Sequence, residues 1–264
     1  MDTDLRTVTS RDGTVIAYER AGSGPPVVLV GGAFCERSFA GPLAGLLEPD
    51  FTVITYDRRG RGDSGDTLPY AVTREVEDMG AVIAAAGGPA YVFGVSSGAV
   101  LALEAAARGL PIRKIVMVEP PYSTGTGRAP APDLAGRYTE LCSSGRRGEA
   151  IALFMTKAVG QPPEAVERVR GTPIWPALEA MAHTLAYDAY IVGDGKVPAE
   201  RAAAVTIPVL AVESTASPQW LRDATRAVAA ALPDGRHLVI PGQFHEVDPL
   251  LLAPELKRFY LSPG

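Results

Sequence analysis

Short apolar runs and longer segments of helical length alternate along the chain. Eight runs rich in β-branched residues, each bounded by polar, glycine or proline positions, predict strands; they are RTVTS, TVIAYER, PPVVLVGG, FTVITYDRRG, AYVFG, RKIVMVEPP, IPVLAVES and RHLVIPG. The first two are expected to form a hairpin around Arg11-Asp12-Gly13. The others are nearly continuous apolar runs, which is typical of parallel strands covered on both faces.

Helical patterns lie between these strands, at Glu36–Leu47, Val72–Ala86, Ser97–Arg108, Pro218–Leu232 and Pro249–Leu261. The alternation predicts a doubly wound α/β fold, in which a mostly parallel sheet of eight strands is flanked by helices.

One interval departs from this alternation. No strand pattern occurs between Pro120 and about Ala204, and helical patterns are found there instead, at Pro132–Ser143, Glu149–Val159, Glu164–Arg170 and Pro176–Ile191. We therefore expect an α/β core formed by residues 1–120 and 206–264, with a helical cap at residues 121–205 inserted between the sixth and seventh strands.

Composition narrows the range of functions. A length of 264 residues suits one globular unit with an insertion. A net charge of −5 argues against nucleic-acid binding, which needs a basic surface. There is no apolar run long enough to span a membrane and no secretory signal pattern, so we expect no membrane association and a cytoplasmic location. The two cysteines, Cys35 and Cys142, have neither the number nor the spacing of a disulfide framework or a zinc site. We expect a small-molecule substrate and no metal or cofactor, with the choice between monomer and homodimer left open.

The segment Gly94-Val95-Ser96-Ser97-Gly98 carries the main chemical signal. It has the form G-x-S-x-G, with a strand pattern before it and a helix pattern after it, which is the context of a nucleophile elbow. Ser96 is therefore the candidate nucleophile. The backbone N–H of Ser97 lies at the expected helix N-terminus, where it can donate to a developing oxyanion.

A serine nucleophile needs a base, and the chain has three histidines. His183 falls in the expected cap helices and His237 in the last strand. His245 follows the last strand, at the same edge of the sheet as Ser96, and is the candidate base. The third member of the site is an acid that orients this histidine. The segment after the seventh strand does not supply it, because it contains no aspartate before Asp223. Glu119, at the end of the sixth strand, is favoured. Glu213, at the end of the seventh, is the competing candidate.

A second oxyanion donor is expected in the glycine-rich turn of LVGGAFCERS. The N–H of Ala33 is the first candidate and that of Phe34 the second. Cys35 is expected to line the floor of the pocket. Phe34, Trp175, Met181 and Tyr187 are candidate substrate contacts, because a cap places apolar side chains over such a site.

The stretch Gly60–Gly65 also matches G-x-G-x-x-G, but DTLPYAV follows it where a dinucleotide-binding loop would open directly into a helix. No nucleotide cofactor is therefore expected. The preceding Asp57, Arg58 and Arg59 are interpreted as a turn whose charges hold the end of the fourth strand.

Taken together, LVGGAF, TYDRRGRGDSG, FGVSSGA and a late GQFHEV make nearly the whole chain resemble the α/β-hydrolase superfamily. Many relatives have His-Gly after the third strand, where this chain has Gly31-Gly32. The pairing of GVSSGA with VEPP, without an aspartate after the seventh strand, is similar to zearalenone-type lactonases. In those enzymes a glutamate after the sixth strand completes the triad, which implies a Ser96, His245 and Glu119 triad here. Serine rather than aspartate at position 96 disfavours the epoxide hydrolase and haloalkane dehalogenase branches.

The resemblance implies a cofactor-free serine hydrolase that cleaves a carboxylic ester or lactone of a small, largely apolar substrate through an acyl-enzyme. Two alternatives stay open. The first is a non-hydrolytic enzyme using the same site, such as a perhydrolase, an acyltransferase or a biosynthetic cyclase. The second is a ligand-binding receptor on a hydrolase scaffold.

Overall fold

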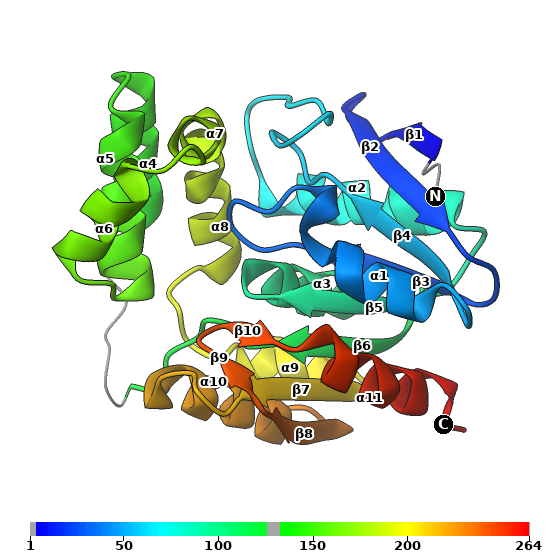
Figure 1. Cartoon of the computed structure of the whole chain (residues 1–264). Helices are drawn as coiled ribbons and strands as arrows, with labels where there is room; N and C mark the ends of the chain where they lie inside the picture. Colours follow the sequence, from blue (N-terminus) through cyan, green and yellow to red (C-terminus); the bar gives the residue numbers. More distant parts are fainter. Residues whose placement is uncertain (1–3, 126–132, 264) are drawn as a thin grey trace.

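A sheet of eight strands forms the centre of the protein (Figure 1). The computed structural model describes residues 4–125 and 133–263. The strand order is β1-β2-β4-β3-β5-β6-β7-β8. β1 pairs antiparallel with β2, β2 pairs antiparallel with β4, and all other neighbours in the sheet are parallel. The strands are β1 (Asp4–Thr9), β2 (Val15–Ala21), β3 (Pro26–Val30), β4 (Thr52–Tyr56), β5 (Ala90–Val95), β6 (Ile112–Val118), β7 (Val209–Ser214) and β8 (Gly235–Ile240). The predicted hairpin and mostly parallel sheet are confirmed.

Helices cover both faces of the sheet, which explains why its central strands are largely apolar. Every side chain of β4 and of β7 is buried. Alternate residues of one strand enter different cores: Val28 and Val30 of β3 pack on the side of α2 and α3, whereas Val27 and Leu29 pack on the side of α1 and α11. The helices that flank the sheet are α1 (Gly41–Leu47), preceded by the short η1 (Arg37–Ala40), then α2 (Val72–Ala85), α3 (Ser97–Ala107), α10 (Gln219–Ala231) and α11 (Pro249–Leu261).

A group of helices lies between β6 and β7 in the chain. They are α4 (Leu134–Ser143), α5 (Arg147–Leu153), the π-helix η2 (Phe154–Val159), α6 (Pro163–Arg170), α7 (Trp175–Met181), η3 (Ala182–Thr184), α8 (Leu185–Val192) and α9 (Ala199–Ala204). Figure 1 shows α4 to α8 gathered at one side of the sheet. We call residues 121–205 the inserted segment. Its extent as a separate cap stays a prediction, and Pro132, the expected start of its first helix, lies outside the described residues.

Except for α9, which no predicted pattern covers, the inserted helices occur where helical patterns were predicted, but two patterns are interrupted. The pattern at 149–159 is α5 followed by the π-helix, and the pattern at 176–191 is divided among α7, η3 and α8. Within the described ranges, no helix combines the length and the apolar character needed to cross a membrane.

Lys114 joins the sheet to the last helix. It belongs to β6 and is only 7% exposed. Its Nζ donates to the carbonyl oxygens of Phe259 at 2.8 Å and Ser262 at 2.7 Å, and to Ser262 Oγ at 3.0 Å. The last carbonyls of a helix have no partner within the helix and favour a positive charge nearby. Lys114 therefore anchors the C-terminal end of α11.

We expect Lys114→Met to lower the free energy of unfolding by about 2 kcal/mol, because it leaves buried carbonyl oxygens without a donor. Urea denaturation followed by circular dichroism measures this. Lys257→Met is the matched control: Lys257 makes a more exposed ion pair with Asp50, and its loss should cost at most about 1 kcal/mol. A Lys114→Met protein as stable as the control would contradict the anchoring role.

Candidate active site

Ser96 occupies a sharp turn between β5 and α3. Its backbone has φ 57° and ψ −126°, a conformation that is rare for a residue with a side chain. The two glycines of the motif are required by close packing. A Cβ on Gly94 would lie 2.6 Å from the carbonyl oxygen of Gly98, and a Cβ on Gly98 would lie 2.6 Å from that of Gly31. The strand can therefore turn directly into the helix, and Ser96 lines a cavity at this edge of the sheet.

Glu119 and His245 come together at the same edge. Glu119 follows β6 and is fully buried, and its Oε2 lies 2.8 Å from His245 Nδ1. Its Oε1 accepts a hydrogen bond from the backbone N–H of Ser214, at 2.8 Å. His245 forms the turn of a small hairpin, β9 (Gly242–Gln243) and β10 (Glu246–Val247), which sequence analysis did not predict. His245 also lines the cavity that Ser96 lines.

The competing acid, Glu213, is engaged elsewhere. Its carboxylate is also buried, but Oε1 accepts from Arg226 Nη2 at 2.7 Å and Oε2 lies 3.0 Å from His237 Nε2. His183, the remaining histidine, has its Nε2 3.6 Å from Asp66 Oδ2. Of the three histidines, His245 is the one in the wall of the cavity.

Backbone conformation marks the same residues independently. In the described part of the chain, five residues other than glycine have positive φ: Phe34, Ser96, Glu119, Asp133 and His245. Such conformations cost free energy and tend to occur at functional sites, where surrounding contacts maintain them. Glu119, at φ 46°, has this feature, and Glu213 does not.

The glycine-rich turn after β3 packs directly on the elbow. A Cβ on Gly32 would lie 2.9 Å from Ser96 Cβ, so only glycine allows this approach. Ala33 follows in the turn, and Ser97 is the first residue of α3; both line the cavity. Neither backbone N–H donates a hydrogen bond to another described residue. The two N–H groups therefore remain the candidate oxyanion donors.

A buried cluster of charges underlies this turn and the elbow. Arg58 donates to both oxygens of Glu75, at 2.7 and 2.9 Å, and through Nη1 to Asp188 of α8 at 2.8 Å. Arg61 Nη2 donates to the other oxygen of Asp188, also at 2.8 Å. Burial by itself raises the pKa of Asp188, but the charges of Arg61 and Arg58 lower that pKa below its usual value. The turn at Asp57, Arg58 and Arg59 thus does more than hold the end of β4.

The cavity has a volume of about 680 Å³ and a mainly apolar wall. Its apolar and aromatic members come from the core and from the inserted segment, and they include Phe39, Val95, Tyr138, Phe154, Leu185, Ala189, Tyr190, Val192, Trp220, Leu221 and Phe244. Lys157 is the one cationic side chain among its described lining residues. Cys35 lines the cavity, as sequence analysis expected, and burial raises the pKa of its thiol.

The structure does not place the four expected substrate contacts, Phe34, Trp175, Met181 and Tyr187, in the cavity wall. Trp175 packs in a core inside the inserted segment, and Met181 is also buried. Tyr187 stacks on Tyr70 and donates to Asp66 Oδ2 at 2.7 Å. Phe34 contacts the ring of Phe154 edge-on.

Residues that were not expected from the sequence line the cavity instead, although the sequence contains signals for them. In α8, Leu185, Ala189 and Val192 follow the i, i+4, i+7 spacing of one helix face, and that face lines the cavity. Trp220 and Leu221 open α10, directly after the loop at the carboxyl end of β7, which is where ligands bind in open α/β sheets.

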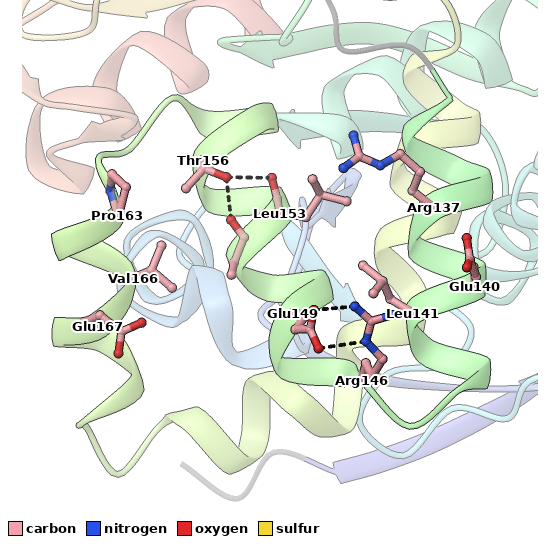
Figure 2. Close-up of a pocket in the computed structure, with 11 residues that line it drawn as sticks. Arg137, Glu140, Leu141, Arg146, Glu149, Leu153, Thr156, Pro163, Val166 and Glu167 are labelled. Atoms are coloured by element: carbon pink, nitrogen blue, oxygen red, sulfur yellow. Dashed lines mark hydrogen bonds and ion pairs between the residues drawn. The ribbon is translucent and has the colours of Figure 1, made fainter.

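A second hollow lies among the inserted helices alone (Figure 2). Residues of α4, α5, η2 and α6 line its volume of about 480 Å³. Figure 2 shows the paired hydrogen bonds between Arg146 and Glu149, at 2.7 and 2.6 Å, which neutralise two of its charges. The hollow contains neither Ser96 nor His245.

Comparison with known proteins identifies the family and supports the fold. Residues 27–253 match the model of the alpha/beta hydrolase family. A solved alpha/beta hydrolase from Sphaerobacter thermophilus DSM 20745 is 52% identical, with a TM-score of 0.91 over 97% of this chain and 100% of the other. The hydrolase YraK of Bacillus subtilis (strain 168) is 30% identical over 158 residues, so the match spans only 58% of either protein. The esterase RhEst1 from Rhodococcus sp. ECU1013 is 23% identical with a TM-score of 0.72, over 98% of this chain and 99% of that one, which shows a shared fold.

The fold and the elbow define a member of the α/β hydrolases. The chain belongs to the alpha/beta hydrolase family, as its motifs predicted.

We expect Gly98→Ala to disrupt the turn that holds Ser96, because the Cβ of the new alanine would collide with the carbonyl oxygens of Val30 and Gly31 at the end of β3. The thermal unfolding midpoint should fall by several degrees, consistent with a loss of about 1–3 kcal/mol from overpacking, and reactivity toward a fluorophosphonate should disappear. Gly45→Ala is the control: beyond its chain neighbours and its own helix backbone, no atom lies within 4 Å of the new Cβ, and alanine in a helix should leave stability equal or higher. Equal behaviour of the two variants would show that the close approach is not required.

Proposed function

We propose that the protein is a cofactor-free serine hydrolase that cleaves a carboxylic ester or lactone of a small, largely apolar substrate. The observation that carries this proposal is the 2.8 Å contact between the buried Glu119 Oε2 and Nδ1 of His245, a histidine in the wall of the cavity that Ser96 also lines. A buried carboxylate on Nδ1 fixes the imidazole so that Nε2 is free to accept a proton.

The reaction would proceed in two stages. Ser96 Oγ attacks the carbonyl carbon while His245 Nε2 takes its proton, and Glu119 stabilises the imidazolium that forms. The backbone N–H groups of Ala33 and Ser97 hold the oxyanion. His245 then protonates the leaving oxygen, which departs as an alcohol or, in a lactone, stays attached as the free end of the acyl group. Water, activated by His245, releases the acid and regenerates Ser96.

The cavity supports a substrate of modest size with an apolar body. A volume of about 680 Å³ falls in the range that encloses small organic ligands. Its apolar wall gains free energy by removing hydrocarbon from water, roughly 25 cal/mol for each Å² buried. The acidic residues of the wall are already engaged, Asp188 by two arginines and Asp133 by the backbone N–H of Gly136.

The proposed triad predicts that replacing Glu119 by glutamine affects catalysis far more than the same replacement of Glu213. Ser96→Ala should abolish fluorophosphonate labelling, and Glu119→Gln should lower kcat for p-nitrophenyl butyrate by about 10³-fold or more, because the histidine loses its orienting charge. Glu213→Gln is the matched buried control and should stay within about threefold of the wild type.

Intact-protein mass spectrometry and p-nitrophenol release measure these effects. If kcat falls strongly in Glu213→Gln while Glu119→Gln stays active, the acid is Glu213 and not Glu119. A wild-type protein that neither labels nor turns over would refute the hydrolase proposal and favour a receptor. Acyl-enzyme that forms but resists water would favour acyl transfer.

Filling the cavity should change selectivity for acyl length. We expect Ala189→Phe to lower kcat/KM for p-nitrophenyl octanoate at least tenfold more than for the acetate, because the new ring occupies space that a long chain needs. Ala180→Phe, at an exposed position of α7, should leave the ratio unchanged. The ratio of the two kcat/KM values is the measurement, and equal loss for both esters would place the acyl chain elsewhere.

A further inference from the structure

Asp188 belongs to the inserted segment, yet it contacts the elbow. Figure 1 shows α8 beside the start of α3. The Asp188 carboxylate accepts hydrogen bonds from Ser97 Oγ at 2.7 Å, from Arg58 Nη1 at 2.8 Å and from Arg61 Nη2 at 2.8 Å. It is 5% exposed and forms part of the cavity wall. A buried carboxylate thus holds the side chain of the residue that follows Ser96.

Arg58 extends this contact to the opposite side of the site. The same Nη1 that binds Asp188 lies 3.2 Å from the carbonyl oxygen of Gly31 and 3.4 Å from Ser97 Oγ. Gly31 begins the turn that contains Ala33, and Ser97 begins α3. One buried ion pair therefore contacts both backbone segments whose N–H groups are the candidate oxyanion donors.

The balance of buried charges makes the contacts of Arg58 and Ser97 depend on the carboxylate of Asp188. Arg58 and Arg61 are each about 1% exposed, and the carboxylates of Glu75 and Asp188 balance their charges. A neutral amide at position 188 would remove one of the two negative charges and turn an N–H group toward an arginine. Buried charges without a partner are costly, so the side chains and the backbone they contact would shift.

We propose that Asp188 is a positioning residue of the oxyanion hole, which holds Ser97 directly and the Gly31–Ala33 turn through Arg58. This role rests on the proposed hydrolase function. It means that the inserted segment contributes to the chemical step as well as to the walls of the cavity. Oxyanion donors act only when they point at the position where charge develops, and small displacements are expensive in rate.

The test is Asp188→Asn, with steady-state hydrolysis of p-nitrophenyl butyrate and inhibition by butylboronic acid, which forms a tetrahedral adduct on a serine. We expect kcat to fall about 10- to 100-fold, less than the loss of a whole donor. KM should change by less than threefold, because the contact acts in the transition state. The inhibition constant for the boronic acid should rise by a factor similar to the loss in kcat.

Asp78→Asn is the matched control. Asp78 is 1% exposed and accepts from Arg59 at 2.7 and 2.8 Å, so its loss equally disrupts a buried arginine pair. It does not line the cavity. We expect this variant to lose thermal stability while kcat and boronic acid inhibition stay within about threefold of the wild type.

The outcomes separate the two proposals. An inactive wild type overturns the hydrolase function, and this role with it. An active wild type with Asp188→Asn at normal kcat, or with only a raised KM, overturns the positioning role alone. If Asp188→Asn does not fold, Ser97→Ala decides, since it removes one hydroxyl and keeps the backbone N–H. A three- to tenfold lower kcat at constant KM supports the role, and an unchanged kcat overturns it.

Discussion

The close approach of the turn after β3 to the start of α3 is the constraint on which the site depends. Gly32, Gly94 and Gly98 are three positions of this region where a Cβ would collide with neighbouring atoms. Because these backbones meet, Ser96 can occupy its strained turn and two N–H groups can lie beside it. The constraint is steric, and a small increase in residue size at these positions would remove the geometry as a whole.

Buried carboxylates are a second feature of the structure, and each one has its own hydrogen-bond or ion-pair partners. Glu119 has a histidine and a backbone N–H, Glu213 has an arginine and a histidine, and Asp188 has two arginines and a hydroxyl. Carboxylates removed from water need such partners. What distinguishes Glu119 is that its partner histidine lines the cavity, which is what the proposed reaction requires.

The sheet, the flanking helices and the elbow could be predicted from local pattern, since β-branched runs and the G-x-S-x-G spacing depend on neighbours in sequence. The sequence favours Glu119 over Glu213 only in part, because both glutamates lie at the ends of adjacent strands. Their contacts in space are what separate the two. The residues that line the cavity could be predicted only in part. Which face of α8 meets the cavity depends on how the helix is rotated, and for this reason the expected contact is Tyr187 whereas Ala189 lines the wall. The β9–β10 hairpin is too short to leave a periodic signal.

The end of β7 supports both the acid and the base. The backbone N–H of Ser214 donates to Glu119, Ser214 Oγ donates to the carbonyl oxygen of Gln243 at 2.7 Å, and Ser217 Oγ accepts from the N–H of His245 at 3.1 Å. One short segment therefore holds two groups that lie 126 residues apart in the sequence. Thermal displacement of that segment carries the carboxylate and the imidazole together, so their separation varies less than the position of either.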